Sequence, residues 1–175
     1  PVGITEIEDN ALECWFLHNV KLPDGLITMG NFIFNCCSKL EEVEIPDSVK
    51  SIGLYAFRGC QNLKKVKLSA GLEELSDSLF CDCKSLESIE IPDSVTTIGW
   101  YAFGGCTGLM SITLPTNISV IENSMGPVFG NCANLSSITV ESGNTTYDSR
   151  NNCNAIIETS TNTLVLGCKN TSISP

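Results

Sequence analysis

The stretch Cys37–Gly59, CSKLEEVEIPDSVKSIGLYAFRG, decides the fold because the chain repeats it. From Cys60 the sequence reads CQNLKKVKLSAGLEELSDSLFCD, and from Cys83 it reads CKSLESIEIPDSVTTIGWYAFGG. A longer unit, CTGLMSITLPTNISVIENSMGPVFGN, follows from Cys106. Cysteine therefore recurs in steps of 23 residues. A fixed period in the twenties, with leucine at strand spacing, is typical of a leucine-rich-repeat solenoid.

Each unit has two parts that favour short strands. In the first part, Leu-x-x-Val-x-Ile-Pro, side chains two residues apart point the same way, so Val43 and Ile45 should face inward. Pro46 lacks an N–H group and ends this strand. The second part opens with the turn signal Asp-Ser and returns Val49 and Ile52 to the core. Their β-branched side chains favour a second, shorter strand.

These patterns predict the fold class. We expect a leucine-rich-repeat solenoid of the α/β-horseshoe class that is mostly β-structure, with a parallel sheet on its concave face. A unit of 23 residues leaves no room for a full helix on the outer side. The convex face should therefore carry short strands and 3₁₀ or helical turns, one of them at Tyr-Ala-Phe. The segment 122–127, Glu-Asn-Ser-Met-Gly-Pro, makes this unit three residues longer between Ile121 and Phe129 than the preceding unit, and it should bulge from that side.

Two residue types recur in register and predict internal ladders. Phenylalanine should stack as a spine through the core at Phe34, Phe57, Phe80, Phe103 and Phe129. Cysteine holds one equivalent position in successive units, at Cys14, Cys37, Cys60, Cys83, Cys106 and Cys132. Reduced cysteine behaves as a small buried hydrophobe. Side chains stacked in parallel keep their Cβ atoms farther apart than a disulfide requires, so we expect free thiols here.

The pattern changes after residue 140. Residues 1–140 form the predicted solenoid of 23-residue units, and residues 141–175 form a segment that continues or caps it. Its sequence predicts a β-hairpin centred on Ser160 and Thr161. In that register Cys153 and Cys168 lie opposite each other, which makes them the candidate disulfide pair of the chain. Free thiols at both positions are an equally good prediction.

Composition narrows the classes of function. The 175 residues carry a formal net charge of −10, which repels phosphate backbones and anionic lipid. We therefore expect no nucleic-acid partner, and no apolar run is long enough for membrane insertion. His18 is the only histidine, which argues against a base-activated nucleophile or a metal triad. We expect no enzyme activity, no cofactor and no metal.

The units LEEVEIPDSVKSIGLYAFRGC and LESIEIPDSVTTIGWYAFGGC resemble the BspA-type leucine-rich repeats of surface proteins from Bacteroides-like bacteria. The segment YDSRNNCNAIIETSTNTLVLGCKNT resembles the hairpin found between such repeats. The unit KKVKLSAGLEELSDSLF departs from the pattern, because it lacks the proline and the glycine after Leu75. The resemblance implies a cell-surface or secreted location and a role in adhesion or host interaction.

Charged side chains alternate along the predicted concave strands. Three rungs follow one another: a glutamate rung, a lysine rung and a second glutamate rung. In register, Glu41 and Glu87 would flank Lys64, and Glu44 and Glu90 would flank Lys67. Such pairs keep neighbouring repeats in register, and a binding stripe is the second interpretation. The candidate concave binding face comprises Glu42, Glu44, Lys64, Lys65, Lys67, Glu87 and Glu90.

Two functional hypotheses follow. The first is a non-catalytic domain that binds a protein or other macromolecule, such as an extracellular protein or glycan, through its concave face. The second is a structural spacer within a larger surface protein, in which the charges serve only stacking.

Overall fold

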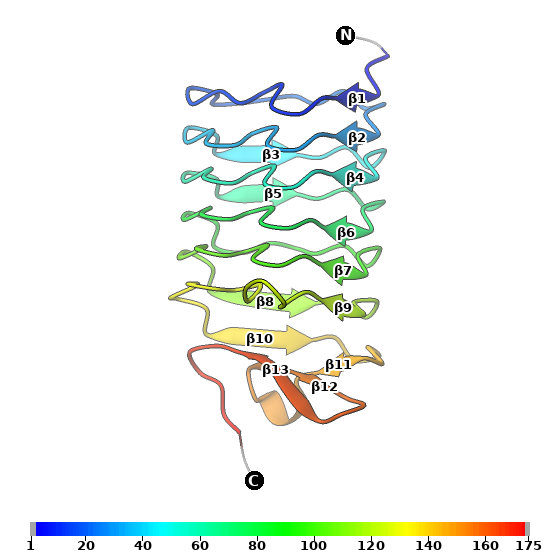
Figure 1. Cartoon of the computed structure of the whole chain (residues 1–175), viewed down its shortest axis with the longest axis vertical. Helices are drawn as coiled ribbons and strands as arrows, with labels where there is room; N and C mark the ends of the chain where they lie inside the picture. Colours follow the sequence, from blue (N-terminus) through cyan, green and yellow to red (C-terminus); the bar gives the residue numbers. More distant parts are fainter. Residues whose placement is uncertain (1–2, 174–175) are drawn as a thin grey trace.

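The computed structural model describes residues 3–173, which form a stack of similar coils (Figure 1). One column of strands, here called the long-strand face, contains β3 (Glu42–Glu44), β5 (Lys65–Lys67), β8 (Ser111–Leu114) and β10 (Ser137–Val140). A second column, the short-strand face, contains β1 (Glu6–Ile7), β2 (Thr28–Met29), β4 (Ser51–Ile52), β6 (Glu74–Leu75), β7 (Thr97–Ile98) and β9 (Val120–Ile121). Paired strands within both columns are parallel. The structure is thus the predicted leucine-rich-repeat solenoid.

Equivalent residues of neighbouring coils lie side by side. Val43 pairs with Val66 across β3 and β5, and Ile112 pairs with Ile138 across β8 and β10. All four side chains are buried, while the residues that flank them along β3 and β5 are exposed. The alternation follows from the two-residue period of a strand. It confirms the strand predicted from Leu-x-x-Val-x-Ile-Pro.

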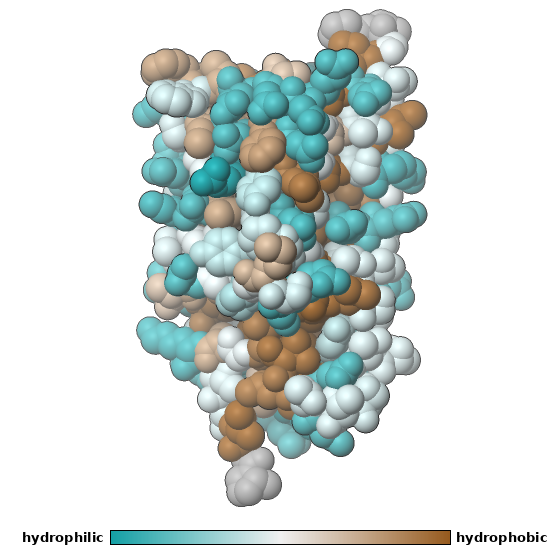
Figure 2. Space-filling model, in the orientation of Figure 1, coloured by the Kyte–Doolittle hydropathy of each residue, from teal (hydrophilic) through white to brown (hydrophobic). Residues whose placement is uncertain are grey.

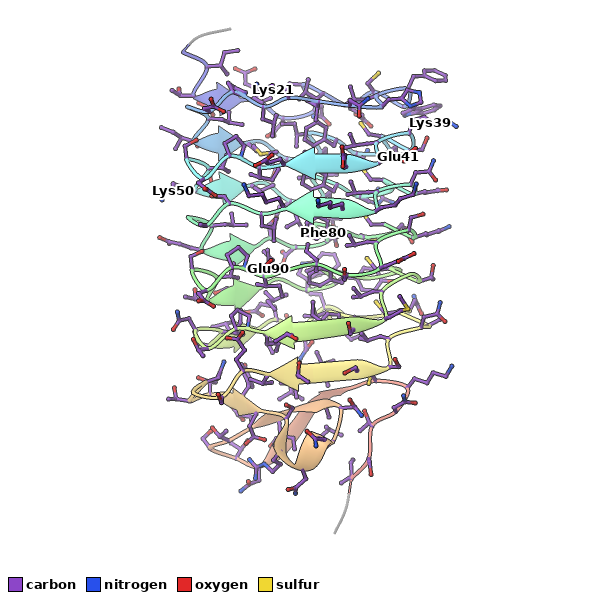
Figure 3. The ribbon with its side chains drawn as sticks, turned by 180° about the vertical axis from the view of Figure 1, so that it is seen from behind. Lys21, Lys39, Glu41, Lys50, Phe80 and Glu90 are labelled. Atoms are coloured by element: carbon purple, nitrogen blue, oxygen red, sulfur yellow. The ribbon has the colours of Figure 1, made fainter. Side chains whose placement is uncertain are left out.

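The predicted phenylalanine spine runs through the core. Its rings stack at centroid distances of 5.1 to 5.6 Å, with interplanar angles of 14 to 22°. Figure 3 shows Phe80 inside the stack, whereas Lys39 and Lys50 project from opposite edges. Because each ring packs against the coils on both sides, the spine links the coils into one core.

The ladder cysteines add a contact that the sequence did not predict. Each thiol from the second coil onward donates its S–H to a carbonyl of the preceding coil. The acceptor is Phe34 O for Cys60, Phe57 O for Cys83 and Phe80 O for Cys106, each at 3.1 Å. Burial raises the pKa of these three thiols, so they stay protonated and can donate.

The turns opposite the long strands are built from left-handed residues. One such residue recurs at Phe32, Tyr55, Ser78 and Tyr101, with φ between 53 and 57°. Main-chain bonds to the next coil hold these turns, as when Tyr55 N donates to Asp77 O at 3.1 Å. The turn lies where Tyr-Ala-Phe predicted it, but only η1 (Arg150–Asn152) is a 3₁₀ helix within residues 3–173. The insertion after β9 leaves Met125 76% exposed.

The stack contains an irregularity, here called the stacking break, beside the unit that lacks proline and glycine. Gly53 lies so close to the preceding coil that a Cβ would come within 2.5 Å of Asn31 N. Ser76 stands at the equivalent place one coil later. No strand pairing joins β4 to β6 in the described residues, and the Ser76 hydroxyl donates to Gly53 O at 2.8 Å instead.

The same coil lacks strand pairing with its other neighbour on the long-strand face. Residues 87–91, which should form the strand after β5, are not paired with β5 or β8. Ser69, which replaces the corner proline, is fully buried and donates its hydroxyl to Val49 O at 2.7 Å. The coil 60–82 therefore pairs with the coil before it through β5 and with the coil after it through β6.

The predicted hairpin is present at the C-terminal end. It pairs β12 (Ala155–Glu158) with β13 (Thr163–Gly167), and β11 (Tyr147–Asp148) pairs on the other side of β12. Ile156 is fully buried in the same core as the solenoid. Hydrophobic surface gathers near this end of the stack (Figure 2). The division at residue 140 stays a prediction, and its outer limits, residues 1 and 175, lie outside the described residues.

A bulge between Ile156 and Ile157 shifts the hairpin register by one residue. Cys153 and Cys168 are therefore no longer directly opposite, and both are free thiols here. The Cys168 thiol donates to Asn154 O at 3.2 Å, and the Cys153 thiol to Ala155 O at 3.8 Å. The bridge stays a prediction, which a count of free thiols in denatured protein prepared without reductant would test.

Candidate interaction face

The outward side chains of β3 and β5 are those of the predicted charged rungs. Glu42 lies beside Lys65, and Glu44 lies beside Lys67, in the parallel register. All four are exposed because the alternate residues, Val43 and Val66, take the inward positions. The fold therefore places the predicted lysine rung directly against the preceding glutamate rung.

Two ion pairs join these rungs. Lys64 Nζ lies 2.9 Å from Glu41 Oε2, and Lys67 Nζ lies 2.5 Å from Glu44 Oε1. The hydrogen bond from Lys64 lowers the pKa of Glu41, and the bond to Glu44 raises the pKa of Lys67. All four side chains are more than half exposed. Salt screens such pairs, so they contribute little to stability by themselves.

The second glutamate rung does not complete the predicted arrangement. Within residues 3–173, Glu87 forms no ion pair with Lys64, and Glu90 forms none with Lys67. The stacking break is the reason, because residues 87–91 are not held in register against β5. Lys65 also has no ion-pair partner in this part of the chain.

The stacking break leaves a trough in the long-strand face. This hollow of about 1040 Å³ lies over residues 87–91 and is bounded by β5 on one side and β8 on the other. Its floor includes Ile89, which is partly exposed, whereas the equivalent Ile112 is 2% exposed. A second hollow of about 520 Å³ lies over β3 and β5, and Lys65 lines both. The trough was not predicted from the sequence.

Beyond the trough, the side chains of β8 and β10 are uncharged. Thr113 of β8 and Thr139 of β10 face outward, and their Oγ1 atoms are 2.9 Å apart. Met110, just before β8, is 51% exposed. Hydroxyl groups of this kind offer hydrogen bonds to a partner without a requirement for charge.

Groups that could support catalysis are dispersed in the described residues. His18 lies at a small hollow beside Glu41 and Lys64, and none of the described residues gather into a group of three metal ligands. Burial raises the pKa of the Cys132 thiol to about 11. Thiols of this kind are poor nucleophiles at neutral pH, because the thiolate is the reactive form. No helix among the described residues is long and apolar enough to cross a membrane.

The family of the chain follows from its sequence. The model of the BspA-type leucine-rich repeat region matches residues 1–44 and 28–158 in 6 copies. The chain therefore belongs to the BspA-type leucine-rich repeat family, as its repeat units predicted. Such repeats are typically non-catalytic and act as protein-interaction or structural modules. No curated protein is significantly similar to the chain.

Solved bacterial structures share the fold. The T. pallidum leucine-rich repeat protein is 29% identical over 78% of this chain, with a TM-score of 0.62. A leucine-rich repeat protein from Bacteroides ovatus is 27% identical over 69%, with a TM-score of 0.60. A leucine-rich cell surface protein from Faecalibacterium prausnitzii is 26% identical over 93%, with a TM-score of 0.64. The chain spans 58%, 33% and 48% of these three proteins, respectively.

Proposed function

We propose that this chain is a binding domain of a cell-surface or secreted protein and that it holds a macromolecular partner through its long-strand face. The observation that carries the proposal is the form of this face. It presents exposed charged and hydroxyl side chains on a continuous buried core, and the trough hollows it. Partner surfaces dock on such rigid, pre-formed scaffolds with little loss of conformational entropy. The cell-surface protein from F. prausnitzii supports the location.

The charged rungs have unequal roles in this proposal. Lys64 and Lys67 already hold glutamates of the preceding coil, so they serve stacking as well as any partner. Lys65 lines two hollows and has no ion-pair partner within residues 3–173. We therefore assign Lys65 the larger role in binding among the candidate residues.

The experiment compares charge reversals on and off the face. Immobilised extracellular matrix proteins are first screened for binding to the chain by biolayer interferometry. The variants Lys65→Glu and Lys64→Glu/Lys65→Glu/Lys67→Glu should weaken any binding found at least 10-fold. Lys50→Glu, which changes the lysine just before β4 of the short-strand face, should leave it unchanged. Equal binding by all variants would contradict the proposal.

A structural spacer is the second candidate, and the two ion pairs between coils favour it. In a spacer, the triple lysine reversal would lower the melting temperature because three glutamates would then face Glu41, Glu42 and Glu44. Binding would be absent from the start or unaffected by the reversal. Measuring both the melting temperature and the binding of the triple variant therefore distinguishes a binding domain from a spacer.

A further inference from the structure

The trough over residues 87–91 has features that fit a particular kind of partner. Ser88, Ile89, Glu90 and Ile91 make no main-chain hydrogen bond to another coil in the described residues. Equivalent residues of β8 are paired with β10. Residues 88–91 therefore keep main-chain donors and acceptors without a partner from another coil, at the spacing of an extended strand. Burying such groups without a hydrogen-bond partner costs free energy, so an occupant that covers them must supply hydrogen-bond partners.

The floor and walls of the trough differ in chemistry. Ile89 is partly exposed on the floor, which gives an aliphatic contact at the centre. Exposed hydroxyl groups of Ser111 and Thr113 line the wall formed by β8. An aliphatic side chain of an occupant would fill the space above Ile89, and its neighbours would reach the polar walls.

The two ends of the trough carry opposite charge. Lys84 and Lys169, together with Lys64 and Glu87, line an adjoining hollow of about 630 Å³ at the end where the strands begin, so this end keeps an excess of positive charge. Asp47, Asp93 and Glu141 line the other end, where the strands turn the corner. Lys84, Lys169 and the three carboxylates form no ion pair within residues 3–173. An extended segment that follows the direction of residues 84–93, at about 3.3 Å per residue, would pass from one charged end to the other.

We propose that the trough binds an extended polypeptide segment of a partner protein. The segment carries an acidic side chain at one end, a basic side chain at the other and an aliphatic side chain between them. The proposal rests on the function proposed above and names the chemistry of the partner. A neutral glycan would leave both charged ends unused, and the uniform charge of a nucleic acid would be repelled by the carboxylate end.

Selection from a library of displayed random twelve-residue peptides tests this assignment. Peptides enriched on the unchanged chain should carry one acidic and one basic residue on either side of an aliphatic residue. Lys84→Glu/Lys169→Glu makes both ends negative, so it should enrich peptides with basic residues at both positions. Asp47→Lys/Asp93→Lys makes both ends positive and should enrich peptides with two acidic residues. Because a peptide can lie in either direction, these composition changes are more informative than a reversal of its order.

Blocking variants locate the bound peptide. Ile89→Arg fills the trough from its floor, and Ser111→Arg fills it from the exposed wall, so each should weaken binding of an enriched peptide at least 10-fold. Ser51→Arg, on the exposed surface of β4, should have no effect. The Ser111 variant keeps the test valid if Ile89→Arg lowers the melting temperature, because the Ser111 side chain is exposed.

Other outcomes separate this inference from the proposed function. Peptides that are lost with Asn19→Arg, in the second hollow of the same face, but retained by Ile89→Arg and Ser111→Arg would overturn the trough as the site and leave the face as the binding surface. Peptides indifferent to every variant on the face would contradict both. Neutral oligosaccharides whose binding is lost with Ile89→Arg would overturn the polypeptide assignment alone.

Discussion

The two halves of the long-strand face share a backbone register but use different surface contacts. Between β3 and β5, two lysine–glutamate ion pairs cross from strand to strand. Between β8 and β10, the corresponding contact is a hydrogen bond between the hydroxyls of Thr113 and Thr139. The buried residues beneath are alike in both halves, since β-branched Val or Ile pairs with its equivalent. We conclude that the core sets the register and that the outward residues are free to vary.

The largest expected effect tests this conclusion at the core. Phe80→Ala removes a fully buried ring that stacks on Phe57 and Phe103. It should reduce the free energy of unfolding by about 3–5 kcal/mol, measured by urea denaturation. Phe16→Ala is the matched control, because Phe16 is 77% exposed. A loss at Phe80 no larger than that of a face variant would contradict a register set by the core.

The second prediction concerns the close approach that the stacking break lacks. Gly53→Ala places a Cβ within 2.5 Å of Asn31 N, so the two coils must separate. We expect a loss of about 1–3 kcal/mol in the free energy of unfolding. Gly25→Ala is the control, since nothing lies within 4 Å of an added Cβ there. Equal stability of the two variants would show that the coils can move apart at no cost.

The thiol ladder gives the third prediction, which is a dependence on pH. Burial raises the pKa of Cys83 well above its ordinary value of 9.0. Above about pH 9 the unfolded chain loses this proton while the folded chain keeps it, so stability falls as the pH rises. The free energy of unfolding should fall by about 1.4 kcal/mol per pH unit for each such thiol. Urea denaturation at successive pH values measures this slope, and Cys83→Ala should reduce it.

The repeat sequence predicted the parts of the fold that rest on local patterns. Val43 and Ile45 marked the strand, and the period of phenylalanine marked the spine. The left-handed Tyr55 was not predicted, because a bulky aromatic residue rarely adopts positive φ and main-chain bonds to the next coil hold it there. The missing glycine at Ser76 was visible in the sequence. The effect of this serine on strand pairing depends on its distance from the neighbouring coil, and that distance cannot be read from the sequence of one repeat.

The sequence predicted the arrangement of the charged rungs only where neighbouring strands are paired in register. The sequence placed Lys67 beside Glu44, and the structure has that pair. It also placed Glu90 beside Lys67, but the stacking break separates residues 87–91 from β5. The trough is a consequence of this separation. Its role in binding stays a proposal, as do the roles of Glu42, Glu87 and the other candidate residues.

The smallest expected effect addresses the two surface contacts directly. Lys67→Ala removes an exposed ion pair, so the stability difference from the unchanged chain should shrink as NaCl is raised from about 0.05 to 0.5 M. Thr139→Val removes a hydrogen bond between uncharged groups and should cost about 0.2–1 kcal/mol at both salt concentrations. Urea, which is uncharged, is the suitable denaturant for both. If both losses responded equally to salt, the two halves would not differ in the way that their side chains indicate.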